Sequence, residues 1–267
     1  MSTEAEVIGS IAALWRYPVK SMRGQTIEHA FVAYSGIYGD RLYAFTSSRG
    51  ANFFPYLTAR DHQEMLLYTP RFRQPDKARQ PVNWAEAEAT SVGITPLFSS
   101  IDELAVDVEA PGGEIYAIDD PALAQRLAAS AGEGLKVALS HSQRAMTDCR
   151  PLSLISLQTG RQLAEETGLT IDKRRFRANI YLDLLSGQGF AEDQLVGRSL
   201  KLGNKVVITI VERDPRCAMI TYDPDTAEAT PQILRQVSKS HQRNAGIYAA
   251  VLVEGMVAAG DRVELIP

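Results

Sequence analysis

The sequence predicts a mostly β (α+β) fold with a small barrel and a few helices. Short apolar runs recur along the whole chain, and they are separated by turn signals rich in glycine, proline, asparagine and aspartate. Several short strands at this spacing are typical of a small barrel rather than of alternating strands and helices. Helical periodicity with capping residues is confined to a few segments.

Residues 1–133 are predicted to form the smaller domain. The strand Ile8–Tyr17 should end at Pro18, because proline cannot donate to a sheet ladder. Asp120 should cap a helix that begins at Pro121 and runs to Gly132. The other elements expected here are strands at Thr26–Ala33, Arg41–Thr46 and Glu64–Thr69, a turn at Ser47–Asn52, a loop over 71–91, and a hairpin of Leu104–Val108 and Glu114–Ile118.

Residues 134–267 are predicted to form the barrel core. A helix from Ser156 to Thr167 should end at Gly168, and another should open at Thr230-Pro231. Arg177 and Asn179 occupy alternate positions of one predicted strand, so both should point to the same face. The strands expected here are Leu135–Leu139, Pro151–Ile155, Phe176–Asp183, Ser199–Leu202, Val206–Val211, Gly246–Val253 and Asp261–Ile266.

The composition excludes several classes of protein. The 267 residues are 45% hydrophobic and 22% charged, as expected of a soluble globular chain, and no apolar run approaches the ~18 residues that span a bilayer. A net charge of −4 gives no general basic face for nucleic acid, so any basic site must be local. The acidic segment Met1–Glu6 lacks the features of a signal peptide. Because Cys149 and Cys217 are too few for a disulfide framework or an iron–sulfur cluster, we expect a cytoplasmic protein.

Cys217 is the first candidate for chemistry. It follows the β-branched run Val206–Val211, which predicts a buried strand that leads into a loop at this thiol. Arg213 and Arg216 should favour the thiolate, which makes Cys217 a candidate soft metal ligand or nucleophile. The alternative is a small buried hydrophobic residue. Prolines and arginines around the thiol favour the first interpretation, because an inert core cysteine needs neither.

A second candidate is a phosphate site after Pro18. Lys20 and Ser21, with Gly24 close behind, could hold a phosphate through ammonium, hydroxyl and backbone N–H groups. A solvated turn explains the segment equally well when the segment is taken alone. The four histidines show no ligand spacing, so a histidine-rich metal site is not expected.

Two ordered sets of segments are informative together. The first set is Tyr17–Gly24, Gly39-Asp40-Arg41 and Leu57–Arg60; the second is Phe176–Asn179, Arg216–Ala218 with Asp223–Thr226, Gly246–Tyr248 and Gly260–Val263. Together they resemble the MOSC proteins, in the version that also carries a MOSC N-terminal β-barrel domain. The resemblance covers nearly the whole chain, and it implies a MOSC-type β-barrel core packed with a smaller N-terminal β-barrel domain and a few helices. Within this group, the chain is similar to the mitochondrial amidoxime-reducing component and its bacterial counterparts.

This resemblance implies a bound molybdenum cofactor, with Cys217 as the molybdenum ligand and catalytic residue. It implies that an oxygen atom is removed from a small N-hydroxylated or N-oxide substrate at this metal. Two electrons would then come from a separate reductase or small redox protein, because no flavin or nicotinamide motif is present. The residues implied to hold the cofactor are Lys20, Ser21, Arg41, Arg177, Asn179, Arg216 and Tyr248, with Thr58, Arg60 and Ser156 lining the same cleft.

Two departures from the family pattern leave the substrate open. Pro215 stands where relatives often have serine, and Ala178 replaces a proline that is usual between Arg177 and Asn179. Two alternative functions also remain. Cys217 could carry a persulfide for sulfur transfer, or the chain could carry the cofactor without catalysing a reaction.

Overall fold

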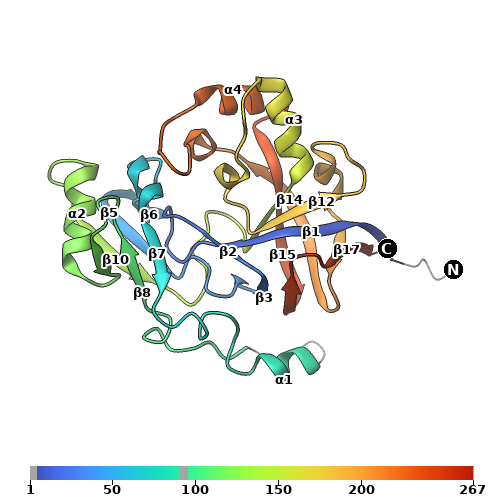
Figure 1. Ribbon diagram of the computed structural model, residues 1–267, viewed down its shortest axis with the longest axis horizontal. Helices are drawn as coiled ribbons and strands as arrows, with labels where there is room; N and C mark the ends of the chain where they lie inside the picture. Colours follow the sequence, from blue (N-terminus) through green and yellow to red (C-terminus); the bar gives the residue numbers. More distant parts are fainter. Residues whose placement is uncertain (1–4, 91–95, 267) are drawn as a thin grey trace.

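Strands make up most of the regular structure in the computed structural model, which describes residues 5–90 and 96–266 (Figure 1). The strands are β1 (Glu6–Arg16), β2 (Gln25–Ile27), β3 (His29–Ala33), β4 (Gly36–Ile37), β5 (Tyr43–Ala51), β6 (Phe54–Tyr56), β7 (Thr69–Phe72), β8 (Val106–Glu109), β9 (Ile115–Ala117), β10 (Val137–His141), β11 (Leu152–Ser156), β12 (Ile180–Leu184), β13 (Ser199–Leu202), β14 (Val206–Pro215), β15 (Asn244–Val253), β16 (Gly255–Ala258) and β17 (Arg262–Ile266).

The helices are short, and the longest have eleven residues. The α-helices in the described part of the chain are α1 (Trp84–Ala89), α2 (Pro121–Ala131), α3 (Leu157–Thr167) and α4 (Pro231–Ser240). Single turns of 3₁₀-helix form η1 (Gln63–Leu67), η2 (Lys173–Phe176), η3 (Ala191–Leu195) and η4 (Ala218–Thr221).

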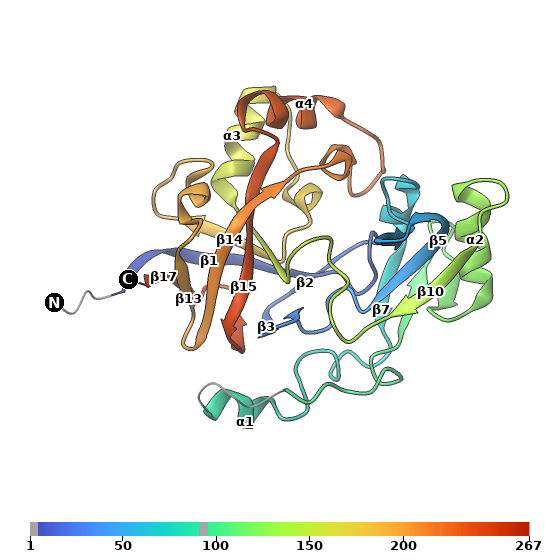
Figure 2. The ribbon, with the colours of Figure 1, turned by 180° about the vertical axis from the view of Figure 1, so that it is seen from behind.

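A closed barrel organises the larger half of the molecule. Its strands follow the order β12, β11, β15, β14, β13, β17 and β1, and pairing between β1 and β12 closes the ring, with β2 attached to β1. The long antiparallel strands β14 and β15 run side by side in Figure 2. Alternate apolar side chains on these strands fill the interior, since successive strand residues point to opposite faces. Leu14, Leu182, Ile208 and Val263 are among the fully buried members.

The smaller half contains three short sheets and a core of its own, while Ala30, Val32, Ile37 and Val257 of one of these sheets pack into the barrel core. Their strand orders are β10-β5-β6, β16-β3-β4 and β7-β8-β9. Phe31, Tyr43, Phe45 and Met65 are completely or almost completely buried within this core. Helix α2 lies along this half beside β10, whereas α3 and α4 cover one end of the barrel (Figure 1). The two halves meet along the segments that follow β1 and β14, and this is where the candidate site lies.

The structure confirms the predicted fold class, mostly β with a closed barrel and a few helices. It also confirms helix capping at two places. The Asp120 side chain accepts a hydrogen bond from Ala122 N at the start of α2, and Gly168 ends α3 in the left-handed conformation.

Four local predictions were wrong. Glu64–Thr69 is not a strand: η1 covers most of it and β7 begins only at Thr69. Ser47–Ala51 continues β5, so the turn comes later than expected. The predicted loop over 71–91 contains α1 within its described part. Phe176 closes η2 and Arg177 is left-handed, so the strand predicted from Phe176 begins only at Ile180.

The N-terminal strand β1 pairs with strands that lie beyond the predicted domain boundary between residues 133 and 134. β1 pairs with β12 and β17, and β3 pairs with β16, so the first 33 residues help to build sheets with the second half. The domain boundary itself stays a prediction. Most of the segment Met1–Glu6, on which the signal-peptide prediction rests, lies outside the described residues. None of the described helices has the length and apolar character needed to cross a membrane.

Candidate functional site

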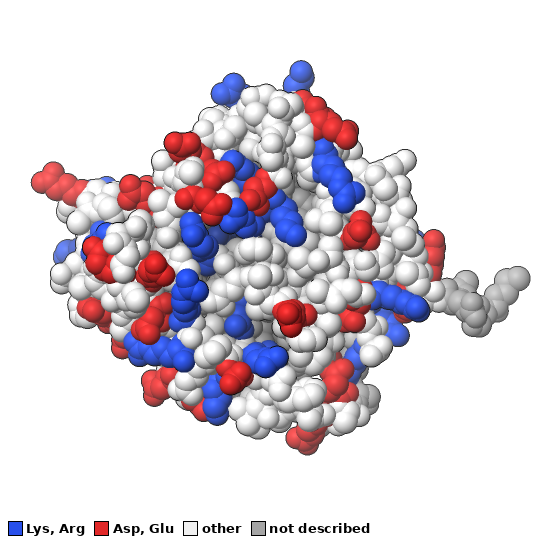
Figure 3. Space-filling view, in the orientation of Figure 1, with Lys and Arg blue, Asp and Glu red and all other residues white. Residues whose placement is uncertain are grey.

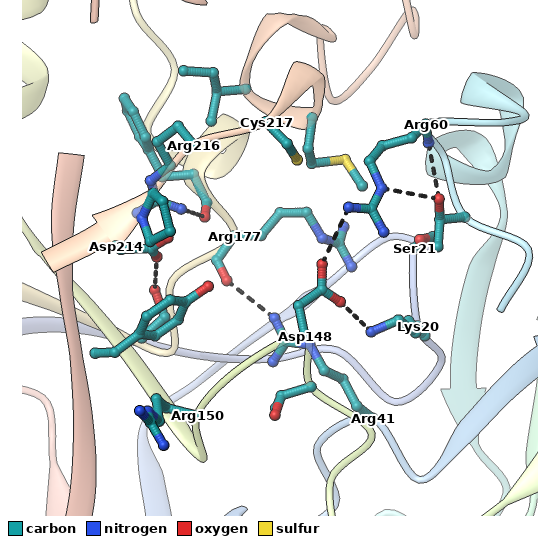
Figure 4. Close-up of a pocket in the computed structure, with 18 of the residues that line it drawn as sticks. Lys20, Ser21, Arg41, Arg60, Asp148, Arg150, Arg177, Asp214, Arg216 and Cys217 are labelled. Carbon is teal, nitrogen blue, oxygen red and sulfur yellow. Dashed lines mark hydrogen bonds and ion pairs between the residues drawn. The ribbon is translucent and has the colours of Figure 1, made fainter. Parts of the chain in front are cut away.

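A basic pocket lies between the two halves, and its empty volume of about 760 Å³ includes space that is open to solvent (Figure 4). Ten of the eleven residues predicted for the site line it: Lys20, Ser21, Arg41, Thr58, Arg60, Arg177, Asn179, Arg216, Cys217 and Tyr248. The pocket is also lined by residues that the sequence interpretation did not select, among them Thr147, Asp148, Arg150, Ser153 and Asp214.

Cys217 stands where β14 ends. β14 pairs with β15 as far as Pro215, opposite Asn244, and the chain then turns into η4 immediately after the thiol. The predicted transition from strand to loop is therefore present, although the strand is longer than expected. Cys217 is a free, partly exposed cysteine, and in Figure 4 its side chain is placed at the opposite end of the pocket from Lys20.

The flanking arginines of Cys217 bind other groups. Arg216 Nε donates to Ala245 O at 2.6 Å and Nη1 donates to Phe176 O at 2.9 Å. Arg216 Nη2 lies 2.9 Å from Asp214 Oδ2 in an ion pair. Arg213 donates through Nη2 to Gln242 Oε1 at 2.6 Å. Arg216 is thus fixed in the wall beside Cys217, while Arg213 does not line the pocket.

Lys20 is a buried cation, and only 4% of the residue is exposed. Its ammonium donates to Met146 O at 2.9 Å and forms an ion pair with Asp148. Burial lowers the pKa of Lys20, and the Asp148 charge opposes this effect. Burial would raise the pKa of Asp148, but the charges of Lys20, Arg60 and Arg41 outweigh it and hold that pKa below its usual value. Asp148 therefore remains a carboxylate between these basic residues.

Arg41 and Arg177 stack against the same aromatic ring. Their guanidinium carbons lie 4.8 and 4.3 Å from the centre of the Tyr17 ring. Arg41 is paired with Asp40 and donates through Nη2 to Arg177 O at 3.2 Å. Arg177 donates through Nη1 to Met22 O at 2.8 Å, and burial lowers its pKa to about 10.

The backbone around the pocket is strained. Seven described residues other than glycine have a positive φ, and three of them line this pocket: Ser21 at 65°, Arg41 at 46° and Arg177 at 52°. This left-handed region is unfavourable for residues with a Cβ atom, and such strain gathers at functional sites. All three were predicted as cofactor ligands from sequence, but their conformation was not. Arg41 and Arg177 were expected in strands; instead, Arg41 lies in a bend before β5 and Arg177 is the C-cap of η2, before β12.

Asn179, Thr58, Arg60 and Tyr248 are the remaining predicted residues that line the pocket. Asn179 joins β1 and β11: its Nδ2 donates to Trp15 O at 3.3 Å and its backbone N donates to Ser153 O at 2.8 Å. Arg60 Nε donates to Thr58 Oγ1 at 3.3 Å. Burial, followed by the charge of Asp214, raises the pKa of Tyr248, so its hydroxyl keeps its proton at neutral pH.

Ser156 does not line the pocket. It is the N-cap of α3 and accepts from Thr159 N at 3.1 Å, while its hydroxyl donates to the buried carboxylate of Glu192 at 2.7 Å. Its place in the molecule is explained by helix capping and by its partner Glu192.

The charges of the pocket suit an anion. Six basic side chains line it against two carboxylates, those of Asp148 and Asp214. Arg177 Nη2 is buried and has no hydrogen-bond partner among the described residues. A phosphate-bearing ligand would satisfy such donors, because guanidinium and ammonium groups bind phosphate oxygens. The donor set, together with one thiol, therefore fits an anionic cofactor whose metal accepts sulfur.

Comparison with known proteins gives the following matches. Residues 8–130 match the model of the MOSC N-terminal beta barrel domain, and residues 141–264 match the model of the MOSC domain. The YuaD protein of Bacillus subtilis is 14% identical over 98% of this chain and 94% of its own, with a TM-score of 0.45. YiiM of Escherichia coli is 20% identical over 44% of this chain and 55% of its own, with a TM-score of 0.33. No match was found among curated proteins.

Proposed function

The chain belongs to the MOSC family, in the form that carries a MOSC N-terminal β-barrel domain, and from this membership we propose that it is a molybdenum-cofactor-dependent oxidoreductase. Its reaction would be the reduction of N-hydroxylated or N-oxide compounds. The observation that carries the proposal is the convergence of Cys217, at the end of β14, with Lys20, Arg41 and Arg177 around one pocket.

The basic residues would hold the cofactor. Lys20, Ser21 and Arg41 offer an ammonium, a hydroxyl and a guanidinium to a phosphate group, and Arg177 offers a buried N–H that has no described partner. Arg216 is held by Ala245, Phe176 and Asp214, so it presents a fixed positive charge in the wall beside Cys217. Cys217 would provide the sulfur ligand. When bound, the cofactor supplies a metal centre that takes the oxygen atom of an N–O bond.

Substrate would enter through a groove that adjoins the pocket. The two cavities share Arg60, Asp148, Pro215, Cys217 and Tyr248. Because its pKa is raised, the Tyr248 hydroxyl stays protonated and can donate a hydrogen bond to a substrate oxygen. Asp148 and Arg60 lie in the same shared wall and can orient a polar substrate. The electrons would come from a separate reductase or small redox protein.

Turnover separates this proposal from its alternatives. Protein from a host that makes the cofactor is mixed with a chemical reductant and an N-hydroxylated amidine, and the amidine formed is quantified. We expect turnover by the wild type and by Cys149→Ser, and none by Cys217→Ser. Bound molybdenum without turnover would indicate a cofactor carrier. A persulfide on Cys217 by mass spectrometry, without molybdenum, would indicate sulfur transfer.

A further inference from the structure

A second cavity lies behind the cofactor pocket and shares only Arg177 and Met219 with it. Its empty volume is about 490 Å³, which includes space that is open to solvent. Residues from both halves of the chain line it, including Trp15 and Leu66 from the first half and Tyr222 from the second. Most of its exposed lining is apolar.

Buried hydrogen-bond donors without acceptors are concentrated around this cavity. Six side-chain nitrogen or oxygen atoms of the described residues are buried without a hydrogen-bond partner, and four of them belong to side chains that line it. These atoms are Trp15 Nε1, Arg23 Nε, Arg175 Nε and Arg177 Nη2. All four are N–H donors. Buried polar groups are nearly always hydrogen-bonded, so a ligand with acceptor oxygens would stabilise these donors by forming hydrogen bonds with them.

The charges point to an acidic occupant. Among the described residues, four arginines and no aspartate or glutamate line the cavity. Arg174 is paired with Asp172 and Asp225, Arg175 with Asp223, and Arg23 with Asp225 at 3.6 Å. Arg177 has no ion pair with a described carboxylate, and its guanidinium donates only to the Met22 carbonyl. Basic and acidic side chains also gather between the smaller half and the region of α4 in Figure 3. A buried guanidinium without a counter-ion is unfavourable, so an anion would stabilise it.

The shape and chemistry of the lining select the kind of anion. Trp15, Leu66, Met219 and Tyr222 offer apolar and aromatic surface to a flat ring. A guanidinium presents parallel N–H groups that match a carboxylate. We propose that this cavity binds a small aromatic carboxylate, with its ring against the apolar residues and its carboxylate toward the arginines. This ligand would be separate from the cofactor, because Trp15, Arg23 and Arg175 line this cavity alone and supply three of the four unpaired donors. Arg177 lines both cavities, and its Nη2 is the donor proposed above for the cofactor.

Tryptophan fluorescence provides a direct test. The chain has two tryptophans, Trp15 in the cavity and Trp84 at the start of α1. In a Trp84→Phe protein the emission therefore reports on Trp15 alone. Benzoate is titrated into this protein at constant ionic strength, with benzamide and acetate in parallel. We expect a saturable change with benzoate and at least tenfold weaker responses to benzamide, which lacks the charge, and to acetate, which lacks the ring.

Variants in the same background locate the site. Arg23→Met keeps an unbranched stem but removes the N–H groups and the charge, so benzoate affinity should fall at least about tenfold. Leu66→Phe should block the ring by filling the cavity. Arg161→Met, an exposed change on α3 away from the cavity, should leave affinity unchanged.

Thermal unfolding shows whether each variant is folded. If Arg23→Met does not fold, the Leu66→Phe result decides. Absence of saturation, or equal affinity in the cavity variants, would overturn the proposal. The titration uses cofactor-free protein and does not depend on the oxidoreductase proposal.

Discussion

Asp148 forms an ion pair with Lys20, although 128 residues separate them in the chain. Asp148 lies between β10 and β11, and Lys20 follows β1, so the contact joins the two halves at the pocket. The Asp148 side chain is 41% exposed, whereas that of Lys20 is only 5% exposed. The partly hydrated carboxylate neutralises a charge that is almost fully withdrawn from water.

This ion pair predicts that the free energy of unfolding depends on pH in the acidic range. The pKa of Asp148 in the folded protein lies below the ordinary aspartate value of 3.8. The carboxylate therefore contributes to folding stability above pH 3.8, and this contribution is lost as the pH falls through the lower pKa of the folded protein. Because the carboxylate is partly exposed, the contribution should be no more than about 1 kcal/mol. Urea unfolding of Asp148→Asn should show a smaller loss of stability below pH 3.8 than the wild type. Asp76→Asn, whose side chain is 93% exposed, is the matched control and should behave as the wild type.

The left-handed backbone at Ser21 predicts a conflict between stability and binding. Ser21→Gly should relieve the strain at φ 65° and raise the melting temperature, with a gain of up to about 1 kcal/mol. Ser21→Ala removes the same hydroxyl but keeps the Cβ atom, so it should give no such gain. Both variants should retain less molybdenum than the wild type. Equal melting temperatures for the two variants would show that strain at this position contributes nothing.

Ser156 provides a test of the capping role. Ser156→Ala removes the N-cap of α3 and a hydrogen bond to the fully buried Glu192, and should cost about 2–3 kcal/mol. Its molybdenum content per folded protein should stay at the wild-type level. Ser238→Ala, an exposed change within α4, should alter stability by less than about 0.5 kcal/mol. Loss of molybdenum from folded Ser156→Ala would instead return this residue to the cofactor site.

His62 predicts a second pH effect near neutrality. Its ring lies 2.9 Å from Ser130 Oγ, and burial lowers its pKa from 6.5 while Glu64 opposes that effect. His62 therefore binds a proton more readily in the unfolded chain than in the folded protein, and the free energy of unfolding should fall as the pH drops below 6.5. His62→Gln should make this decline shallower in urea unfolding at several pH values. His29→Gln, at an exposed position, should reproduce the wild-type slope.

Sequence patterns predicted the strands whose side chains alternate between buried and exposed, and the helices that begin with a capping residue. The alternation in β1 and the Asp120-Pro121 start of α2 are local signals, and both elements lie close to the expected residues. Glu64–Thr69 shows the limit of such patterns, because the run Met65-Leu66 packs into the core equally well from a 3₁₀ turn as from a strand. Burial of a short apolar segment does not specify its backbone conformation.

The site was predictable where a chemical group is itself informative. Cys217 and Lys20 could be selected by thiol and charge, whereas Arg41 was selected only through the family resemblance; all three line one pocket. Asp148 was missed because a carboxylate before a Cys-Arg-Pro sequence looks like an ordinary surface loop; its position just before the buried strand β11 was the available signal. The left-handed bend at Arg177 depends on tertiary contacts with Tyr17 and Met22, which no local pattern contains.

Cys217 is proposed to bind the metal of a molybdenum cofactor in the pocket. X-ray absorption at the molybdenum edge, on protein from a cofactor-competent host, tests it most directly. We expect stoichiometric molybdenum in the wild type and in Cys149→Ser, with the same number of sulfur ligands. Cys217→Ser should either lose the metal or retain it with one sulfur ligand fewer. An unchanged sulfur count in metal-loaded Cys217→Ser, or no molybdenum in the wild type, would contradict the claim.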